Sequence, residues 1–401
     1  MARSIASLPN GARLSDFITL GVIARFIPLP VVFEVLKKNG KESRRIRDLP
    51  AHVVVYYVIA LALFMQVSYR EVLRCIVDGI RWLRTGGPIK LPGKSGISQA
   101  RSRLGPDVLE QLHDQVVRPV ATRATKGAWY GPWRLASLDG STVDTADEES
   151  NAASFGRHHL HRGRSPFPQV RFVSLVENGT HVLFGTRIGG ATRIDEITLA
   201  KRVFETARLG NGTLILADRY FYGFELWNRA RADGADLLWR VKKNMRLPCE
   251  KRLPDGSYLS RIYPNQTDQR RGTNGVTVRV IEYLLEGLTD ADPLYRLITT
   301  IQDHEAAPAK ELAALYHERW EIETTLDELK THLRGGRIVL RSKKPDLVKQ
   351  EFYGFLLAHF AIRSLMHEAA LVAEEDTDRL SFIHAVRVVR RQVVRATTIS
   401  P

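Results

Sequence analysis

Cysteine is scarce in this chain, which has only Cys75 and Cys249 among its 401 residues, and the two are not spaced as a metal-binding pair. A disulfide framework is therefore not expected, and this usage fits a reducing cytoplasm. The N-terminus lacks the apolar segment of a secretory signal. The longest apolar run, residues 53–65, is shorter than the roughly 20 residues that cross a bilayer. We interpret this run as a buried core helix.

Acidic residues are also few relative to basic ones, with 44 Asp and Glu against 59 Lys and Arg, a net charge of +15. Such an excess favours a polyanionic partner, with nucleic acid the obvious one. A GC-rich coding sequence would raise the arginine content in the same way, so charge alone does not decide the function. The hydrophobic fraction of 44% is ordinary for a globular protein, and the length predicts two or three domains.

Helical periodicity dominates residues 1–125, which we predict to form an all-α N-terminal domain that binds DNA. Strand patterns begin near Trp129, and the turn signal Asn178-Gly179 indicates a hairpin. The following order is strand, two hairpin strands, helix, strand, helix and strand, which is typical of a ribonuclease-H-like α/β fold. These elements are expected at residues 133–138, 170–176, 181–188, 195–208, 213–217, 223–232 and 236–241.

The ribonuclease-H-like domain is expected to extend over residues 126–345 and to be interrupted once. Residues 246–295 contain several turn-forming Gly, Asn and Pro residues around one strand pattern, which predicts a β-rich insertion. A strand at 295–301 is then expected to return to the main sheet, followed by one long helix at 310–334. Residues 346–401 are predicted to form a C-terminal helical region.

Two aspartates follow apolar strands in the predicted sheet. Asp139 comes directly after the strand at 133–138, and Asp218 comes directly after the strand at 213–217. Either residue alone could simply be the polar end of a strand. Two carboxylates that converge at strand ends, however, suit Mg²⁺, which prefers oxygen ligands. Two such ions can activate the attacking oxygen and stabilise the leaving oxygen of a phosphodiester.

A third acid lies on the predicted helix at 310–334. At about 100° per residue, Tyr316, Arg319, Glu323 and Lys330 lie within one stripe of about 60° that borders the apolar face. This arrangement favours side chains that face a cleft. A solvated helix face, with Arg319 and Glu323 as a pair four residues apart, would give the same spacing.

These motifs resemble the insertion sequence four family of bacterial DDE transposases. The segment YHERWEIETTLDELK carries the family's Tyr-Arg-Glu-Lys signature, SLDGSTVDTAD resembles its first aspartate motif, and LADRYFYGFELW resembles its second. WRVKKN is similar to the next strand of the family. RDLPAHVVVYYVIALALF and SYREVLR resemble its helical N-terminal domain, and LRSKKPDLVKQEFYGFLLAHFAIR its C-terminal helix. The resemblance therefore covers residues 14–365, which is nearly the whole chain.

The resemblance implies a metal site and a phosphate-binding set. Asp139, Asp218 and Glu323 would bind two Mg²⁺ ions, for which Mn²⁺ can substitute, and Tyr316, Arg319 and Lys330 would hold phosphates at the transposon end. Arginine suits this role because its planar fork matches phosphate oxygens. The insertion would bind or protect a DNA hairpin, although none of its tyrosines can be singled out as a base-stacking residue.

The implied activity is cut-and-paste DNA transposition. A homodimer would bind the inverted-repeat ends of an element in double-stranded DNA, nick one strand, form a hairpin and join the freed ends to target DNA. Such an enzyme would work in the bacterial cytoplasm, associated with the nucleoid and without a membrane. Two alternatives stay open: a catalytically inactive DNA-binding remnant or repressor, and a ribonuclease-H-like nuclease without strand transfer.

Two further basic segments have less specific interpretations. Arg240, Lys242 and Lys243 follow the strand at 236–241 and are expected to contact the DNA backbone, with a simple role in solubility as the alternative. The histidines in residues 158–161 could hold zinc, but a loop that faces solvent or phosphate fits adjacent histidines among arginines better.

Overall fold

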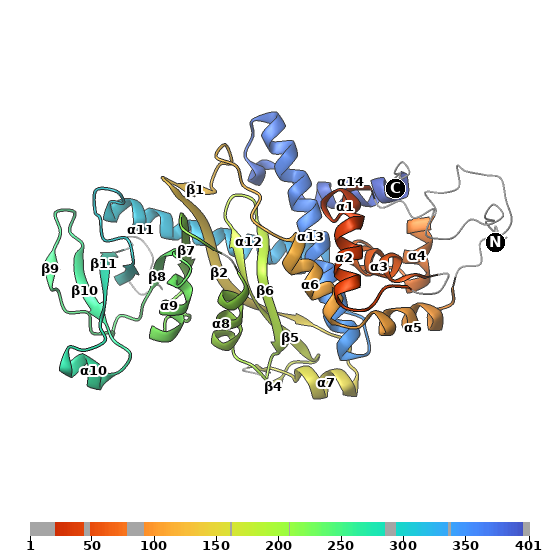
Figure 1. Cartoon of the computed structure of the whole chain (residues 1–401), viewed down its shortest axis with the longest axis horizontal. Helices are drawn as coiled ribbons and strands as arrows, with labels where there is room; N and C mark the ends of the chain where they lie inside the picture. The colour runs from red at the N-terminus through yellow and green to blue at the C-terminus, as the bar shows by residue number, and fades with distance from the viewer. Residues whose placement is uncertain are drawn as a thin grey trace.

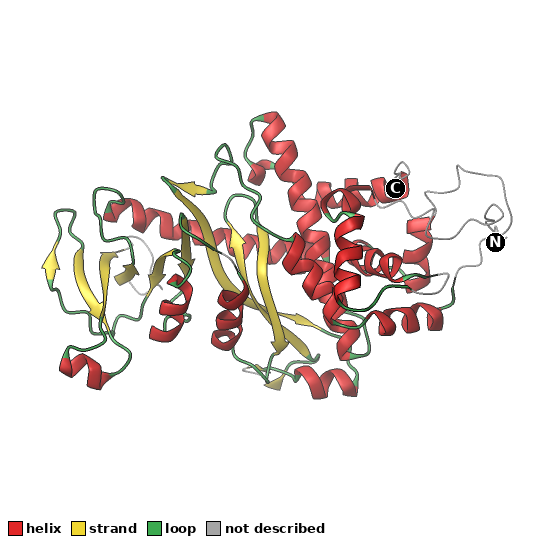
Figure 2. Ribbon diagram, viewed as in Figure 1, coloured by secondary structure: helices red, strands yellow, loops and turns green. Residues whose placement is uncertain are grey.

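The computed structural model describes residues 21–43, 49–77, 92–160, 163–207, 209–284, 294–335 and 338–395. Helices from both ends of the chain gather at one end of the molecule, and a large sheet extends from them to the opposite end (Figures 1 and 2). The helical N-terminal region followed by an α/β sheet region was predicted from the sequence and is confirmed.

The N-terminal region is built from short helices around one buried helix, α3. Its residues Val53 to Leu63 are all buried, as expected for the longest apolar run. Ser68 caps the next helix by accepting a hydrogen bond of 3.2 Å from the backbone N–H of Glu71, as its sequence pattern predicts. The helices are α1 (Gly21–Phe26), α2 (Leu29–Lys38), α3 (Ala51–Leu63), α4 (Tyr69–Val77), α5 (Lys94–Leu104) and α6 (Asp107–Val116).

The central sheet has the predicted ribonuclease-H-like order. β5 and β6 form the antiparallel hairpin, β2 pairs with β5, and β7 and β8 follow in parallel on the other side of β2. Gly179, in the hairpin turn, has φ 76°, a conformation that favours glycine. The elements are β1 (Trp129–Tyr130), β2 (Trp133–Asp144), α7 (Glu149–Phe155), β3 (His159–Leu160), β4 (Gly163–Arg164), β5 (Gln169–Glu177), β6 (Val182–Gly190), α8 (Glu196–Thr206), β7 (Thr213–Ala217), α9 (Phe224–Arg231) and β8 (Asp236–Arg240).

The β-rich segment predicted at 246–295 extends the main sheet. β12 (Leu294–Thr299) pairs with β8 on one side and with β11 on the other, so the sheet order continues β8-β12-β11-β10-β9. The returning strand was predicted, and its pairing with both neighbours makes one continuous sheet. The inserted elements are β9 (Lys251–Arg252), β10 (Tyr258–Ile262), α10 (Gln266–Arg271) and β11 (Val276–Leu284).

The predicted uniform helix at 310–334 has mixed geometry. α11 (Ala309–His317) is followed by a 3₁₀ turn, η3 (Glu318–Trp320), then by α12 (Glu321–Asp327) and by a π-helical segment, η4 (Glu328–Leu333). A 3₁₀ turn winds more tightly and a π-helix more loosely than 3.6 residues per turn. Side-chain directions along this run therefore depart from the even 100° steps that the sequence argument assumed.

The longest C-terminal helix, α13 (Pro345–Ala373), lies in the core beside α3. It is long and apolar enough to cross a membrane, but 72% of its most apolar window is buried inside the fold, as in the core helix of a globular domain. A Cβ atom added to Gly354 would lie 2.9 Å from the backbone oxygen of Val58, so only glycine permits this close approach to α3. η5 (Thr377–Arg379) and α14 (Phe382–Arg395) complete the described chain.

Candidate functional site

Asp139 and Asp218 follow paired positions of two neighbouring strands. β2 and β7 pair in parallel up to Leu138 and Ala217, and each aspartate is the next residue along the chain, Asp139 within β2 and Asp218 just after β7. Neighbouring strands are about 4.8 Å apart, so the two carboxylates come from adjacent positions. The sequence prediction that Asp139 ends its strand was wrong, because β2 stays paired with β5 as far as Asp144. What ends before Asp139 is the pairing with β7.

Arg240 occupies the equivalent position on the next strand. Ala217 pairs with Trp239 in the parallel register of β7 and β8, so Arg240 is level with Asp218. Two residues earlier on each strand, Leu216 and Leu238 pack in the same core cluster as the α11 side chains. Because side chains alternate between the faces of a strand, this pattern directs Asp218 and Arg240 toward the face that α11 covers.

Two basic residues of the segment from α11 to η4 contact β2, one at Asp139 and one two residues beyond it. Arg319 Nη1 lies 3.5 Å from Asp139 Oδ2, and Lys330 Nζ donates a 2.9 Å hydrogen bond to Ser141 Oγ. Glu323 lies between Arg319 and Lys330 in the chain and is exposed, whereas its neighbour Ile322 is buried. Among the described contacts, none joins Glu323 directly to either aspartate.

Burial and two nearby carboxylates raise the pKa of Asp139. Burial raises the pKa of Asp139 to about 6, against the opposing effects of the Gly140 N–H and Arg319, and the negative charges of Glu196 and Asp218 raise it further. Burial likewise raises the pKa of Glu196, although Arg171, 3.8 Å away, opposes this shift. Asp139 is therefore a carboxylate whose negative charge is costly without a cation.

Glu196 is a neighbour that the sequence analysis missed. A Cβ atom added to Gly140 would lie 3.0 Å from the Glu196 carboxyl carbon, which places this acid against the residue that follows Asp139. Glu196 is the first residue of α8, after the capping residue Asp195, and such a position usually indicates only a favourable helix start. Its proximity depends on the packing of α8 against the sheet, which no local motif reveals.

The side chain of Tyr316 is packed in the core and is not accessible to a ligand. Its side chain is 4% exposed, and its hydroxyl donates a 3.4 Å hydrogen bond to the carbonyl of Ala217, next to Asp218. Burial raises the pKa of Tyr316, so the hydroxyl keeps its proton. Trp320, which lies next to Arg319 and was not singled out from the sequence, is instead 57% exposed.

The remaining predicted basic residues vary in exposure. The Arg240 guanidinium stacks over the Tyr295 ring at 3.8 Å, whereas Lys242 and Lys243 are exposed just beyond β8. They follow an interior strand, because β8 lies between β7 and β12. His158 is exposed, and the side chains of the other histidines predicted at 158–161 lie outside the described residues.

Comparison with known families gives the decisive observation. The protein-family model described as "Insertion element 4 transposase N-terminal" matches residues 17–114. The family model described as "Transposase DDE domain" matches residues 133–361. The chain belongs to the insertion element 4 family of DDE transposases. The transposase InsG of insertion sequence element IS4 from Escherichia coli strain K12 is 28% identical over 378 residues, which cover 92% of this chain and 82% of the relative.

Solved structures also contain this transposase fold. The piggyBac transposase, solved as a synaptic complex with hairpin DNA, matches with a TM-score of 0.50 and 10% sequence identity, covering 93% of this chain and 79% of that one. At this identity the similarity concerns the fold alone. The family matches identify the enzyme as a DNA transposase, and its catalytic region has the ribonuclease-H-like fold that the motifs predicted.

Proposed function

We propose that this transposase cleaves and joins DNA at a site formed by Asp139, Asp218 and Glu323. The observation that carries the proposal is the register of β2 and β7, which brings the two aspartates to adjacent positions. The contact of Arg319 with Asp139 supports the third member, because Arg319 and Glu323 are one helical turn apart on the segment that contacts β2.

The donor set suits a hard divalent cation. Burial raises the pKa of Asp139, and the negative charges of Glu196 and Asp218 raise it further. A cation between these carboxylates would remove their mutual repulsion. Asp139, Asp218 and Glu323 offer only oxygen ligands, which are those that Mg²⁺ prefers and Mn²⁺ accepts. We propose two Mg²⁺ ions, which when bound supply charge stabilisation to the attacking and leaving oxygens.

Basic residues near Asp139 and Asp218 would bind the DNA backbone and position it at these acids. Arg319, Lys330 and Arg240 surround the aspartate pair, and Lys242 and Lys243 extend the positive charge beyond β8. The hydrogen bond from Tyr316 to Ala217 would hold the end of β7 in place next to Asp218. To contact a DNA phosphate, the Tyr316 side chain would have to move out of the core. The exposed ring of Trp320, beside Arg319, could stack on an unpaired base.

The proposed reaction sequence has three stages. Water first attacks a phosphodiester at the transposon end and releases a 3′-hydroxyl. This hydroxyl then attacks the opposite strand to form a hairpin, and after the hairpin is opened the end is joined to target DNA. The relative whose structure contains hairpin DNA supports the middle stage for this fold. We propose that a homodimer bound to paired ends carries out these stages in the bacterial cytoplasm, in association with the nucleoid.

Incubation of the purified enzyme with labelled transposon-end DNA and Mg²⁺ tests this proposal. Nicked, hairpin and strand-transfer products should appear in that order. Nicks without joined products would favour a nuclease, and DNA binding without any cleavage would favour an inactive remnant or repressor. Either result would reject the proposed reaction sequence.

A further inference from the structure

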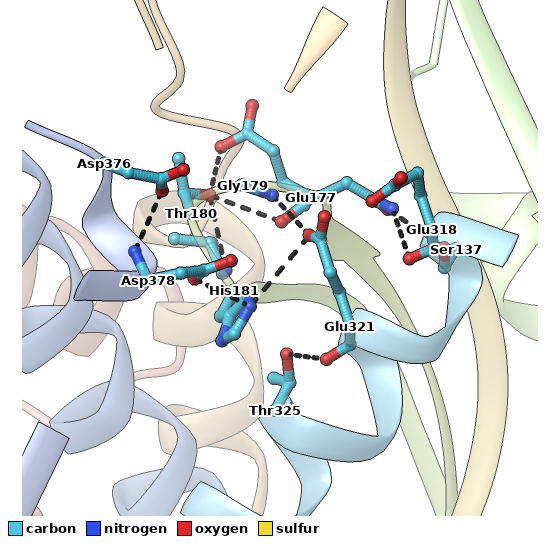
Figure 3. A network of polar contacts seen from close by, with 12 residues as sticks. Ser137, Glu177, Gly179, Thr180, His181, Glu318, Glu321, Thr325, Asp376 and Asp378 are labelled. Atoms are coloured by element: carbon cyan, nitrogen blue, oxygen red, sulfur yellow. Dashed lines mark hydrogen bonds and ion pairs between the residues drawn. The ribbon is translucent and has the colours of Figure 1, made fainter. Parts of the chain in front are cut away.

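A second cluster of ligand-type side chains lies away from the paired aspartates. His181 stands just before β6, Glu321 is the first residue of α12, and Asp378 lies in η5 near the C-terminus (Figure 3). One ligand atom from each of the three lies within 4.8 Å of the other two. His181 Nε2 is 3.2 Å from Asp378 Oδ1 and 3.9 Å from Glu321 Oε2.

The histidine is buried and its outward nitrogen has no hydrogen-bond partner. His181 is 2% exposed, and Nε2 makes no hydrogen bond among the described residues although it points at two carboxylates. His181 ends the β5–β6 turn with φ 59°, a left-handed conformation in which histidine is enriched among non-glycine residues.

The other ring nitrogen faces a carboxylate that is itself held in place. His181 Nδ1 lies 3.5 Å from Glu328 Oε2, and Arg363 grips Glu328 with hydrogen bonds of 2.8 and 2.5 Å. A carboxylate that accepts the Nδ1 proton leaves the lone pair on Nε2 free, which is the usual arrangement behind a metal-binding histidine. Arg363 Nη2 lies closer to Nδ1 than Glu328 does, and a guanidinium can only donate a hydrogen bond. Metal binding therefore requires that Nδ1 turn its proton toward Glu328 and that Nε2 give up its own.

We propose that His181, Glu321 and Asp378 bind one divalent transition-metal ion, with Zn²⁺ as the best-fitting ion. Imidazole nitrogen suits Zn²⁺ and is a poor ligand for Mg²⁺. In a tetrahedral site with bonds of about 2.0–2.1 Å, neighbouring ligand atoms are about 3.3 Å apart. The observed separations of 3.2 and 3.9 Å from Nε2 are close to this value, and the carboxylate oxygens of Glu321 and Asp378, which lie within 4.8 Å of each other, would close around the ion.

The carboxylates retain the coordination capacity that the site requires. Glu321 Oε2 accepts a 2.6 Å hydrogen bond from the Gly179 N–H, which orients the group and leaves a further lone pair on this oxygen. Asp378 is 41% exposed on its side chain, so water can fill the fourth position and ions can enter from solvent. Three protein ligands and one water would satisfy the four-coordinate, tetrahedral geometry that Zn²⁺ prefers.

The ion would join three segments that are distant in the sequence. It would link the β5–β6 turn and the C-terminal η5 to the start of α12, the helix that also carries Glu323. The ligand set does not include Asp139, Asp218 or Glu323, so the site stands whether or not those acids act as proposed. We infer a structural role, in which the ion fixes the start of α12.

Zinc titration of the full chain, with any affinity tag removed, tests the site. The Asp139→Asn, Asp218→Asn and Glu323→Gln substitutions are combined in this protein, so that the acids of the proposed DDE site do not contribute. After treatment with a chelator, competition with a chromophoric zinc indicator should give one tightly bound Zn²⁺ per chain, and thermal unfolding should move to higher temperature. Absence of stoichiometric binding would overturn the proposal.

Single substitutions in the same background assign the ligands. Asp378→Asn changes an exposed group that should leave the fold intact, and we expect it to weaken Zn²⁺ binding at least tenfold. His181→Gln should abolish binding. Asp376→Asn, a matched change two residues away in the same segment, keeps the cap on the Asp378 N–H and should retain full affinity.

The alternative is that His181 donates Nε2–H to Asp378 and binds no metal. In that case Asp378→Asn and Asp376→Asn would leave any Zn²⁺ binding unchanged. Binding that persists in both variants but disappears when His158 is replaced would assign the ion to the exposed histidine segment and reject the site. Substitution with Co²⁺ gives a further readout, since its visible absorption should be lost in the Asp378→Asn protein.

Discussion

The guanidinium of Arg319 lies against the carboxylate of Asp139, with Nη1 3.5 Å from Oδ2. This contact joins η3 to the sheet at Asp139, the first residue of β2 after its pairing with β7 ends. Arg319 is only 12% exposed on its side chain, and its Nε has no hydrogen-bond partner among the described residues. The guanidinium therefore has donors to spare for a phosphate brought to the aspartates.

Replacement of Arg319 by Gln should weaken binding to transposon-end DNA by about 10- to 100-fold, because a charge-assisted contact contributes roughly 1.5–3 kcal/mol. If Arg319 contacts a phosphate, the slope of log K against log salt should also decrease by about one. Fluorescence anisotropy over a range of salt concentrations measures both quantities. Arg229→Gln removes an arginine paired with Glu205 on the surface and serves as the control. An unchanged salt slope would exclude a phosphate contact.

Asp139→Asn and Asp218→Asn should each reduce DNA-end cleavage about 10³-fold or more, because each removes a charged ligand from a site that contributes several kcal/mol. Both variants should still bind end DNA and fold normally. Asp147→Asn, on the exposed segment after β2, provides the matched control and should cleave normally. Cleavage by either of the first two variants at the wild-type rate would remove that residue from the proposed catalytic set.

Trp320→Ala should weaken binding to DNA with an unpaired base near the cleavage site by about 1–3 kcal/mol, the usual contribution of base stacking on an aromatic ring. Its 57% exposure predicts a change in unfolding free energy of less than about 0.5 kcal/mol. Trp320→Phe keeps a stacking surface and should recover most of the affinity. Equal affinities for paired and unpaired substrates in all three proteins would argue against stacking.

Strand order was predictable from the sequence because each core strand is an apolar run that ends at a turn signal or an acid. The parallel run at Thr213–Ala217 was located to the residue, since all five positions are buried and the pattern is continuous. The end of β2 was not predictable. Its last residues are only partly apolar and belong to the strand because β5 pairs with them, which is a long-range contact.

The residues of the proposed site that belong to local motifs could be proposed from the sequence, and those that packing brings near were missed. Asp139 and Asp218 were proposed because each follows an apolar run, and Arg319 was proposed from helix spacing. Glu196 approaches Asp139 only because α8 packs on the sheet. His181 and Asp378 meet because the C-terminal segment folds back on the β5–β6 turn, and their sequence separation leaves no pattern to detect.

The buried pair of Glu328 and Arg363 should contribute far more to stability than a surface pair. Glu328→Gln leaves the guanidinium of Arg363, which is 1% exposed, without its charged partner and should lower the free energy of unfolding by about 3–5 kcal/mol. Glu368→Gln breaks an ion pair with Arg25 whose side chains are 40% and 62% exposed, and should cost about 1 kcal/mol or less. Urea unfolding of both variants makes the comparison. Similar losses would mean that water reaches the Glu328 pair.

Buried histidines should make the fold less stable in mild acid. Burial lowers the pKa of His359 and of His367, whose Nε2 lies 2.8 Å from Thr125 Oγ1. A histidine with a lowered pKa binds its proton more weakly in the folded state than in the unfolded state, where the pKa is about 6.5. The contribution of these two histidines to stability should therefore be complete above pH 6.5 and should decrease as the pH falls below it.

His367→Gln tests this pH dependence, because glutamine can keep the hydrogen bond to Thr125 but does not titrate. The loss of unfolding free energy between pH 7.5 and pH 5.5 should be smaller in this variant than in the wild type. His384→Gln, which changes an exposed histidine of α14, is the control and should follow the wild type. The effect arises because His367 takes up its proton in the unfolded state and not in the folded state. If the variant loses as much stability in acid as the wild type, His367 is instead protonated in the folded protein.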